Sequence, residues 1–457
     1  MLLENKKVLA AGMGKSGAAV IEVLLSARAE VYVYDAKTKE KIDTDIIKKV
    51  EKHGLKSYFG ILPESIGSYD LLVMSPGIPL SIPLVTMAKK AGVEIIGELE
   101  LAYRLCKGKF IAITGTNGKT TTTALTGEIF KNAGRDTFIV GNIGVAAVSK
   151  AIFASEESYM VTEVSSFQLE TIKNFKPKVS AVLNITPDHL NRHKTMENYA
   201  KAKARIYMNQ DETQYFIVNY DNPEAYALKD NCKARVIPFS RTRSLDLGCY
   251  VHDQEICIKD EFMNFHKVCS IEELQIPGNH NLENALASTA IAYWSGIPTD
   301  IIGKTLKGFE GVEHRMEYVD NINGIRFIND SKGTNPDASV KAIEAIQTPM
   351  VLIAGGMNKG SEFRTFIKAF NGKVKYLVLL GETAHKIKET ANEMGFNNVV
   401  IQNNMERCVQ KAFKMAEAGE AVLLSPACAS WDMYPNFEAR GQHFKDCVEG
   451  LRRTLDV

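Results

Sequence analysis

Short runs of apolar residues alternate with longer amphipathic stretches along most of the chain. The first run covers residues 7–11, a stretch with a helical apolar period follows at residues 16–27, and a second apolar run covers residues 30–35. Strands that alternate with helices predict βαβ units and a parallel sheet. We therefore expect an α/β fold from the start of the chain onward.

The same alternation restarts twice, which predicts three domains. Residues 97–105 (GELELAYRL) form a helix pattern that leads into a second unit, and a third unit starts near Val312. A length of 457 residues fits three domains of about 150 residues each. We expect domains at residues 1–98, 99–311 and 312–457. Within the second, residues 230–275 break into short pieces such as ARVIPFS and CYVHDQEICI, which predict a small antiparallel region.

Composition gives no sign of a polyanionic partner. The chain has 55 basic and 54 acidic residues, a formal charge of +1, so no overall field favours nucleic acid or a membrane surface. Its eight cysteines form no CxxC pair, which disfavours a disulfide framework or zinc ribbon. The first residues lack the pattern of a signal peptide, and no apolar run approaches the length of a membrane span. We expect a cytoplasmic protein without membrane insertion.

A first glycine loop, GMGKSG, follows the first predicted strand. It holds Gly12, Gly14 and Gly17, and Asp35 ends the next strand. This spacing and context match the dinucleotide fingerprint, in which backbone N–H groups at a helix N-terminus meet a diphosphate. The pattern leaves open a nicotinamide-dependent oxidoreductase, and also a glycine turn that serves only close packing.

A second glycine loop, TGTNGKTTT at residues 114–122, lies between another predicted strand and helix. Its GKT core matches the end of a P-loop, in which Lys119 would reach the β- and γ-phosphates and Thr120 would bind Mg²⁺. Ile113 stands where the usual pattern has glycine. A helix cap rich in threonine is the structural alternative, but it gives no reason for a lysine between glycine and threonine.

TGTNGKTT resembles the ATP loop of the Mur ligases and of their folylpolyglutamate synthase relatives. The resemblance covers almost the whole chain. It implies a Rossmann-like N-terminal domain, a central P-loop-type ATPase domain with a mainly parallel sheet, and a Rossmann-like C-terminal domain. It also implies an enzyme that phosphorylates a carboxylate and lets an amine displace the phosphate. The implied ATP-loop contacts are Gly115, Thr116, Asn117, Gly118, Lys119, Thr120 and Thr121.

Three further segments resemble the family's metal-binding motifs. VTEVSSFQLE supplies Glu163, NITPDHLNRH supplies His189, and YAKAKARIY supplies Lys203 as a carbamylated lysine. The resemblance implies two Mg²⁺ ions, with Mn²⁺ as a substitute; Thr120 and Glu163 would hold one ion, His189 and Lys203 the other. From the residues alone, Glu163 could form a structural ion pair, His189 could be an ordinary structural histidine, and Lys203 could lie on a solvated helix face with Lys201.

The remaining motifs imply three groups of substrate contacts. Beyond the loop, ATP would meet Asn281, Asn284, Arg315 and Asp330; Asn281 could instead cap a helix. The UDP-substrate would meet Gly14, Lys15, Ser16, Asp35, Lys37, Ser75, Pro76, Gly77 and Asn142. D-Glutamate would meet Lys332, Thr334, Lys359, Ser430 and Phe437, whereas Trp431 stands where other members often carry leucine.

SSFQL and SPACAS favour the D-glutamate-adding members of the family. We therefore expect addition of D-glutamate to UDP-N-acetylmuramoyl-L-alanine through an acyl phosphate, with release of ADP and phosphate, in peptidoglycan precursor synthesis. A relative that adds another amino acid is the nearest alternative. A nicotinamide-dependent oxidoreductase would leave TGTNGKTTT unexplained, and a non-enzymatic nucleotide sensor would be expected to lose Lys119, Glu163, His189 and Lys203. We expect a monomer.

Overall fold

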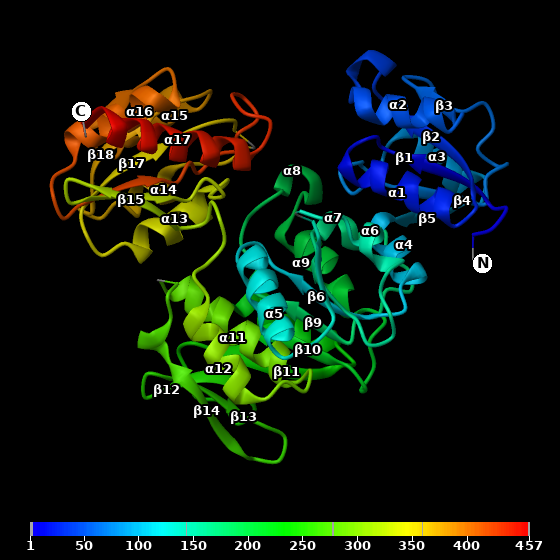
Figure 1. Ribbon diagram of the computed structural model, residues 1–457, viewed down its shortest axis with the longest axis horizontal. Coiled ribbons are helices and arrows are strands. Elements are labelled where there is room, and N and C mark those ends of the chain that lie inside the picture. Colours follow the sequence, from blue (N-terminus) through cyan, green and yellow to red (C-terminus); the bar gives the residue numbers. More distant parts are fainter. Residues whose placement is uncertain (1–2, 143, 277, 359, 456–457) are drawn as a thin grey trace. The chain divides into compact units, whose positions relative to one another are not determined.

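The computed structural model describes residues 3–142, 144–276, 278–358 and 360–455. It contains three β-sheets, of five, nine and six strands (Figure 1). The chain divides into two compact units. The first comprises Met1–Ile185, Glu197–Cys269 and Ala285–Leu306, and the second comprises Thr186–Met196, Ser270–Asn284 and Lys307–Val457. In the part of the chain that the structure describes, no helix is long and apolar enough to cross a membrane.

The first sheet has the strand order β3-β2-β1-β4-β5, and every neighbouring pair is parallel. Helix α3 buries Leu84, Val85 and Ala88 against one face of the sheet, and α1 packs on β1 and β2. The predicted βαβ start is therefore confirmed. The elements are β1 (Lys7–Ala11), α1 (Lys15–Ser26), β2 (Glu30–Asp35), η1 (Lys39–Lys41), α2 (Thr44–Lys52), β3 (Lys56–Phe59), β4 (Leu71–Met74), α3 (Pro83–Lys90) and β5 (Glu94–Gly97).

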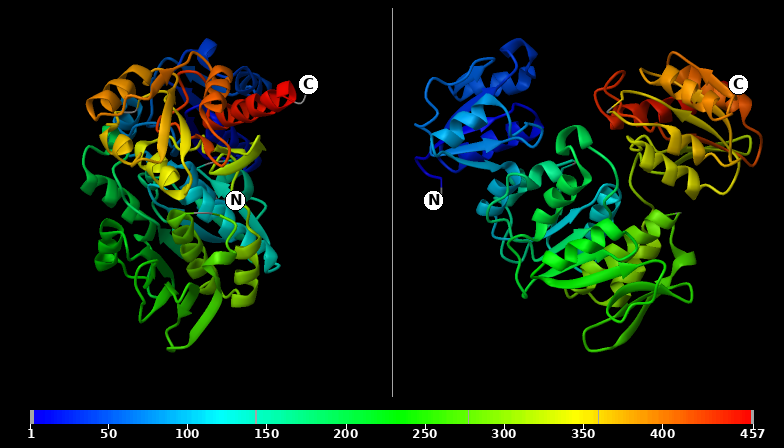
Figure 2. Two further views of the ribbon diagram at one scale, coloured as in Figure 1. Left: turned by 90° about the vertical axis from the view of Figure 1, so that its left-hand side faces the viewer. Right: turned by 180° about the vertical axis from the view of Figure 1, so that it is seen from behind.

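The second sheet has the order β14-β13-β12-β11-β10-β9-β6-β8-β7, with parallel pairing from β12 to β7. Its strands are β6 (Lys109–Thr114), β7 (Thr137–Gly141), β8 (Tyr159–Glu163), β9 (Val179–Val182), β10 (Tyr215–Asn219), β11 (Arg235–Ser240), β12 (Gly248–His252), β13 (Glu255–Lys259) and β14 (Phe265–Ser270). Strands β12 to β14 form one end of this sheet, and β6 lies near the other (Figures 1 and 2).

The predicted antiparallel region is only partly correct. The segment ARVIPFS becomes β11 and pairs in parallel with β10, whereas β12 and β13 form the expected antiparallel pair. The helices of this part of the chain are α4 (Glu98–Leu105), α5 (Lys119–Asn132), α6 (Ala147–Ala151), α7 (Ser166–Leu169), α8 (Leu190–His193), α9 (Met196–Ala204), η2 (Arg205–Tyr207), α10 (Pro223–Tyr226), η3 (Ala227–Asn231), η4 (Ile271–Glu273), α11 (Asn279–Tyr293) and α12 (Thr299–Gly308).

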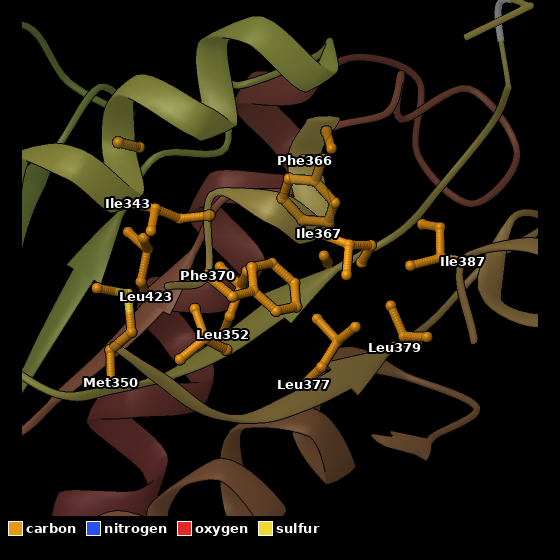
Figure 3. Close-up of a cluster of buried hydrophobic side chains, with 14 of the residues drawn as sticks. Ile343, Met350, Leu352, Phe366, Ile367, Phe370, Leu377, Leu379, Ile387 and Leu423 are labelled. Carbon is orange, nitrogen blue, oxygen red and sulfur yellow. The ribbon is translucent and has the colours of Figure 1, made fainter. Parts of the chain in front are cut away.

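The third sheet has the order β15-β16-β20-β17-β18-β19 and is parallel except for the pair β15–β16. One face packs on α13, α14 and α15 through Ile343, Phe366 and Ile387 (Figure 3). The other face packs on α16 and α17. The elements are β15 (Glu317–Ile322), β16 (Ile325–Asn329), α13 (Pro336–Ala345), β17 (Met350–Ala354), α14 (Arg364–Lys368), β18 (Val374–Leu379), α15 (Ala384–Glu393), β19 (Val399–Ile401), α16 (Met405–Met415), β20 (Ala421–Leu424) and α17 (Phe437–Leu455).

Candidate active site

The second glycine loop joins β6 to α5 in the first unit. Gly118 caps the N-terminus of α5 and has φ 85°, a left-handed conformation that favours glycine. The Lys119 ammonium folds back over the loop and donates to the carbonyl oxygens of Gly115, at 2.9 Å, and Thr116, at 2.7 Å. The flexible Lys119 side chain therefore places a positive charge directly over the loop at the N-terminus of α5. This arrangement suits phosphate binding.

Lys203 lies beside the same loop and is buried, with 1% of its surface exposed. Its ammonium donates to the Gly115 carbonyl at 2.7 Å and lies 4.6 Å from the centre of the Tyr199 ring. Lys201, by contrast, is exposed and pairs with Glu197. The solvated-face alternative for Lys203 is therefore wrong. Burying an ammonium is costly, so this position calls for a specific explanation.

Glu163 ends β8 with 3% of its surface exposed. One carboxylate oxygen accepts the Thr120 hydroxyl at 2.7 Å, and the other accepts the Asn142 amide at 3.3 Å. The Asn142 backbone N–H also donates to the Glu163 carbonyl at 2.9 Å. The structure thus brings together three residues that the sequence analysis placed in separate motifs.

The oxygens of Thr120 and Glu163 fit a hard divalent cation, because Mg²⁺ prefers carboxylate and hydroxyl oxygens. Among the described residues, no group of three or more His, Cys, Asp or Glu side chains could hold a metal by itself. A cation at this position would therefore draw its other ligands from different groups, such as hydroxyls, substrate phosphates or water.

Two residues that the sequence analysis did not select support the loop. Asn184 accepts the backbone N–H of Asn117 at 2.9 Å and donates to the Asn117 carbonyl at 3.1 Å. The Tyr199 hydroxyl accepts the Thr116 hydroxyl at 3.4 Å. Thr121 is buried in the first turn of α5, and no partner for its hydroxyl lies among the described residues. Asn184 comes just after the buried strand β9, a position where site residues of open α/β sheets often lie. This position could have identified Asn184 from the sequence.

The first glycine loop lies at the point where the order of the first sheet reverses, between β1 and β4. A Cβ on Gly17 would lie 1.8 Å from the Gly12 carbonyl oxygen, whereas a Cβ on Gly14 would meet nothing within 4 Å. Gly17 therefore serves close packing, and Gly14 faces open space. Such switch points are the usual ligand positions in open α/β sheets.

Other predicted UDP-substrate residues gather at this loop. Asp35 accepts the backbone N–H groups of Met13, at 2.7 Å, and Lys37, at 2.8 Å. The Ser75 hydroxyl donates to the Gly12 carbonyl at 2.9 Å. Lys15, Lys37 and Gly77 are exposed here, and Ser16 and Pro76 are partly exposed. Asp35 thus braces the loop, in addition to any contact that it makes with a ligand.

In the second unit, Asp330 is buried at the end of β16 and accepts the Ser425 hydroxyl at 2.7 Å. Burial raises the pKa of Asp330 to about 6, although the nearby Arg315 charge opposes this shift. Arg315 also lies near His280. Burial, together with the positive charges of Arg315 and Lys341, lowers the pKa of His280 to about 3. His280 is therefore neutral at physiological pH and was not selected from the sequence.

Asn281 and Asn284 lie on one face of α11, as their spacing predicts. Both side chains are buried, and the Asn284 amide donates to the Asn281 side-chain oxygen at 3.2 Å. Asn281 lies inside α11, which begins at Asn279. The alternative role of Asn281 as the N-cap of the helix is therefore not supported.

Two of the predicted D-glutamate residues meet directly. The Lys332 ammonium lies 5.1 Å from the centre of the Phe437 ring. Ser430 is buried and Thr334 is partly buried, while Lys359 lies outside the described residues. The buried Arg440, which the sequence analysis missed, donates to the carbonyl oxygens of Ser331, at 2.8 Å, and Cys428, at 3.2 Å, one from each flanking loop. The structure thus ties together the segments that precede Lys332 and Ser430.

His189 lies in the second unit, within Thr186–Met196. It adopts a left-handed conformation, with φ 54°, at the start of α8. Its ring Nε2 lies 3.4 Å from Asp188 Oδ2. Because Lys203 belongs to the first unit, the shared metal site of these two residues stays a prediction.

Three family models match consecutive parts of the chain. They are described as "Mur ligase MurD-like, N-terminal domain" at residues 6–97, "Mur ligase middle domain" at residues 113–292, and "Mur ligase, glutamate ligase domain" at residues 314–428.

Curated relatives align over nearly the whole chain. A UDP-N-acetylmuramoylalanine--D-glutamate ligase of Thermoanaerobacter sp. (strain X514) is 52% identical over 456 residues, which cover 99% of this chain and 100% of the relative. A protein of the same name from Clostridioides difficile (strain 630) is 47% identical over 457 residues, with the same coverage.

Solved structures show the same fold at much lower identity. The UDP-N-acetylmuramate-alanine ligase MurC of Thermotoga maritima superposes with a TM-score of 0.61 at 18% identity, over 98% of this chain and 100% of that one. E. coli FolC, in complex with DHPP and ADP, gives 0.58 at 16% identity, over 78% and 93%. Together with the full-length identity to the curated relatives, the matches show that this chain belongs to the Mur ligase family.

Proposed function

We propose that this chain is an ATP-dependent ligase that joins D-glutamate to the alanine carboxylate of UDP-N-acetylmuramoyl-L-alanine. The observation that carries the proposal is identity of about half of all residues, over the full length, to relatives that bear the name of this activity. The two candidate metal-binding oxygens beside a lysine-bearing phosphate loop support it independently.

The reaction needs two displacements. A carboxylate oxygen of the UDP-substrate attacks the γ-phosphorus of ATP, ADP leaves, and an acyl phosphate forms. The D-glutamate amine then attacks the acyl carbon, the amide C–N bond forms, and phosphate leaves with the former carboxylate oxygen. The amine loses a proton in this step. Two anions must converge, so catalysis depends on positioning and on neutralising charge.

Lys119 is proposed to leave the Gly115 and Thr116 carbonyls when ATP binds and to neutralise charge on the migrating phosphoryl group. Thr120 and Glu163 are proposed to hold one Mg²⁺, and His189 and carbamylated Lys203 a second; Mn²⁺ could substitute. Bound divalent cations would neutralise the phosphate oxygens. The buried position of Lys203 beside the loop supports carbamylation, because a carbamate keeps an N–H that can donate to the Gly115 carbonyl and adds two oxygens of the kind that a hard cation prefers.

The other roles are proposed by motif. ATP is assigned to residues 115–121 with Asn281, Asn284, Arg315 and Asp330. The UDP-substrate is assigned to residues 14–16, 75–77, Asp35, Lys37 and Asn142, and D-glutamate to Lys332, Thr334, Lys359, Ser430 and Phe437. Domain boundaries near residues 98 and 311, a monomeric state and a cytoplasmic location belong to the same proposal.

The proposal is tested by measuring phosphate release from ATP with each substrate omitted in turn. Release is expected only when UDP-N-acetylmuramoyl-L-alanine and D-glutamate are both present. Release that does not depend on D-glutamate would contradict the proposal. Substituting L-glutamate or another D-amino acid in the same assay tests whether the chain belongs with relatives that add a different residue.

A further inference from the structure

The segment Thr186–Met196, called the His189 segment below, makes two side-chain contacts with the start of α13. The Thr186 hydroxyl donates to Asp337 Oδ2 at 3.1 Å, and the Asn335 amide donates to Asp188 Oδ2 at a longer 3.5 Å. All four residues belong to the second unit. None of the four residues has a role in the proposed function, although they lie close in sequence to His189 and Thr334, which do.

Asp188 is the link between these contacts and His189. Its Oδ1 accepts the His189 backbone N–H at 2.8 Å, and its Oδ2 lies 3.4 Å from His189 Nε2. His189 has φ 54°, a conformation that costs free energy for a residue with a side chain and persists only where the surroundings hold it. The carboxylate that Asn335 contacts therefore also holds the backbone and the ring of His189.

Asn335 lies on the loop that carries the glutamate candidates. Lys332 and Thr334 precede it, and the Thr334 N–H donates to the Lys332 carbonyl at 2.8 Å. The Asn335 side-chain oxygen caps α13 by accepting the Ala338 N–H at 2.8 Å. One short stretch thus carries both the glutamate candidates and the contact to Asp188.

We propose that Asn335 and Asp337 are positioning residues, which hold the His189 segment to the loop that carries Lys332 and Thr334. The two contacts fix His189 relative to the amino-acid site within the second unit. The proposal deepens the proposed function and rests on it for its kinetic consequence, but the physical coupling does not depend on which substrate is bound.

The chain offers matched variants for a test. Asn335→Asp keeps a good capping oxygen for α13 but loses the amide donor and places a second negative charge opposite Asp188. Asn404→Asp makes the same change at the cap of α16, where the Asn404 oxygen accepts the Arg407 N–H at 2.9 Å. Thr186→Val removes the hydroxyl donor to Asp337, and Thr186→Ser keeps it.

The measurements are amide hydrogen exchange of a peptide covering residues 186–196, without ligands, and steady-state kinetics. Asn335→Asp and Thr186→Val should each speed exchange of this peptide about tenfold, because each removes a hydrogen bond to a carboxylate. Thr186→Ser and Asn404→Asp should match the wild type. In the first two variants kcat should fall about tenfold. KM for the UDP-substrate should stay unchanged, because its candidate residues, at the first sheet and at Asn142, lie outside the His189 segment and the start of α13.

Unchanged exchange in both Asn335→Asp and Thr186→Val would overturn the proposal, and so would an equal increase in Asn404→Asp. Two separate variants are used so that poor folding of one leaves the other decisive. If the wild type releases phosphate without D-glutamate, the proposed function fails while the exchange result still decides whether the His189 segment is held in this way.

Discussion

Lys203 is the residue whose burial most needs an explanation, since a lysine at a neighbouring position is exposed. We expect Lys203→Ala to lower kcat about 100-fold or more, because the carbamate oxygens proposed there would be lost. Short carboxylates such as formate or acetate should restore part of the activity by occupying the vacated space. Lys201→Ala, which removes only an exposed ion pair with Glu197, is the matched control.

Full activity of Lys203→Ala would contradict the proposed carbamate. An inactive variant that no carboxylate rescues, although it folds as the wild type does, would point instead to a structural role for the Lys203 contact with Gly115.

The charge of Glu163 should decide how tightly the enzyme holds the proposed Mg²⁺ ion. Glu163→Gln keeps an oxygen that can accept the Thr120 hydroxyl but removes the negative charge. We expect the Mg²⁺ concentration for half-maximal activity to rise about tenfold or more, because ligand charge tunes affinity for hard cations. The exposed Glu157→Gln should leave this concentration unchanged. An unchanged Mg²⁺ requirement in Glu163→Gln would exclude Glu163 as a ligand.

Asp330 gives the second unit a pH-dependent stability. Its folded-state pKa of about 6 lies above the ordinary value of 3.8, so the native state holds a proton that the unfolded chain releases. The free energy of unfolding therefore falls by up to about 3 kcal/mol as pH rises through the window between these values.

Asp330→Asn should abolish this contribution, because asparagine stays neutral. Urea unfolding should be monitored by hydrogen exchange of a peptide covering residues 325–335. As pH rises from about 3.8 to about 6, the free energy of unfolding of Asp330→Asn should increase relative to that of the wild type. A difference between the two proteins that stays constant with pH would show that Asp330 has an ordinary pKa.

At the scale of elements, two glycines of the first glycine loop have different roles: Gly17 serves packing, and Gly14 is expected to serve ligand binding. Gly17→Ala would place a Cβ 1.8 Å from a backbone oxygen, and we expect it to destabilise the first sheet by about 3 kcal/mol. Gly14→Ala meets open space at a φ of −97° and should leave thermal stability unchanged while weakening binding of the UDP-substrate. Equal effects of both variants on stability would mean that the loop serves packing alone.

The sequence predicted those elements whose signal is local. The apolar runs at residues 7–11 and 30–35 located β1 and β2, because buried parallel strands are apolar on both faces. The sequence did not reveal that β11 pairs in parallel with β10, because the residues of a short strand do not identify the strand that it pairs with. The edge strand β15 (EYVDNI) is partly exposed and largely polar, so its apolar pattern is correspondingly weak.

The same distinction applies to the site. Lys119 and Thr120 belong to one contiguous motif and could be selected from it. Asn184 and Tyr199 support the loop from 67 and 83 positions away. The strand end before Asn184 marks it as a candidate, but no spacing rule connects either residue to the loop. Arg440 holds two loops together from within a helix, where an arginine is most often solvated.

At the scale of the whole molecule, the proposed mechanism has one defining step: the carboxylate is activated by phosphorylation before the amide forms. The UDP-N-acetylmuramoyl-L-alanine carboxylate supplies the oxygen that leaves with phosphate in the second displacement. This oxygen distinguishes the proposed order of bond formation from any mechanism in which ATP is hydrolysed by water.

The most direct measurement labels that carboxylate with ¹⁸O and follows the isotope by mass spectrometry of the released phosphate. The proposed mechanism predicts one ¹⁸O atom in each phosphate released in the presence of D-glutamate, and one retained in the new amide carbonyl. Phosphate free of ¹⁸O, formed at the rate of amide synthesis, would contradict it.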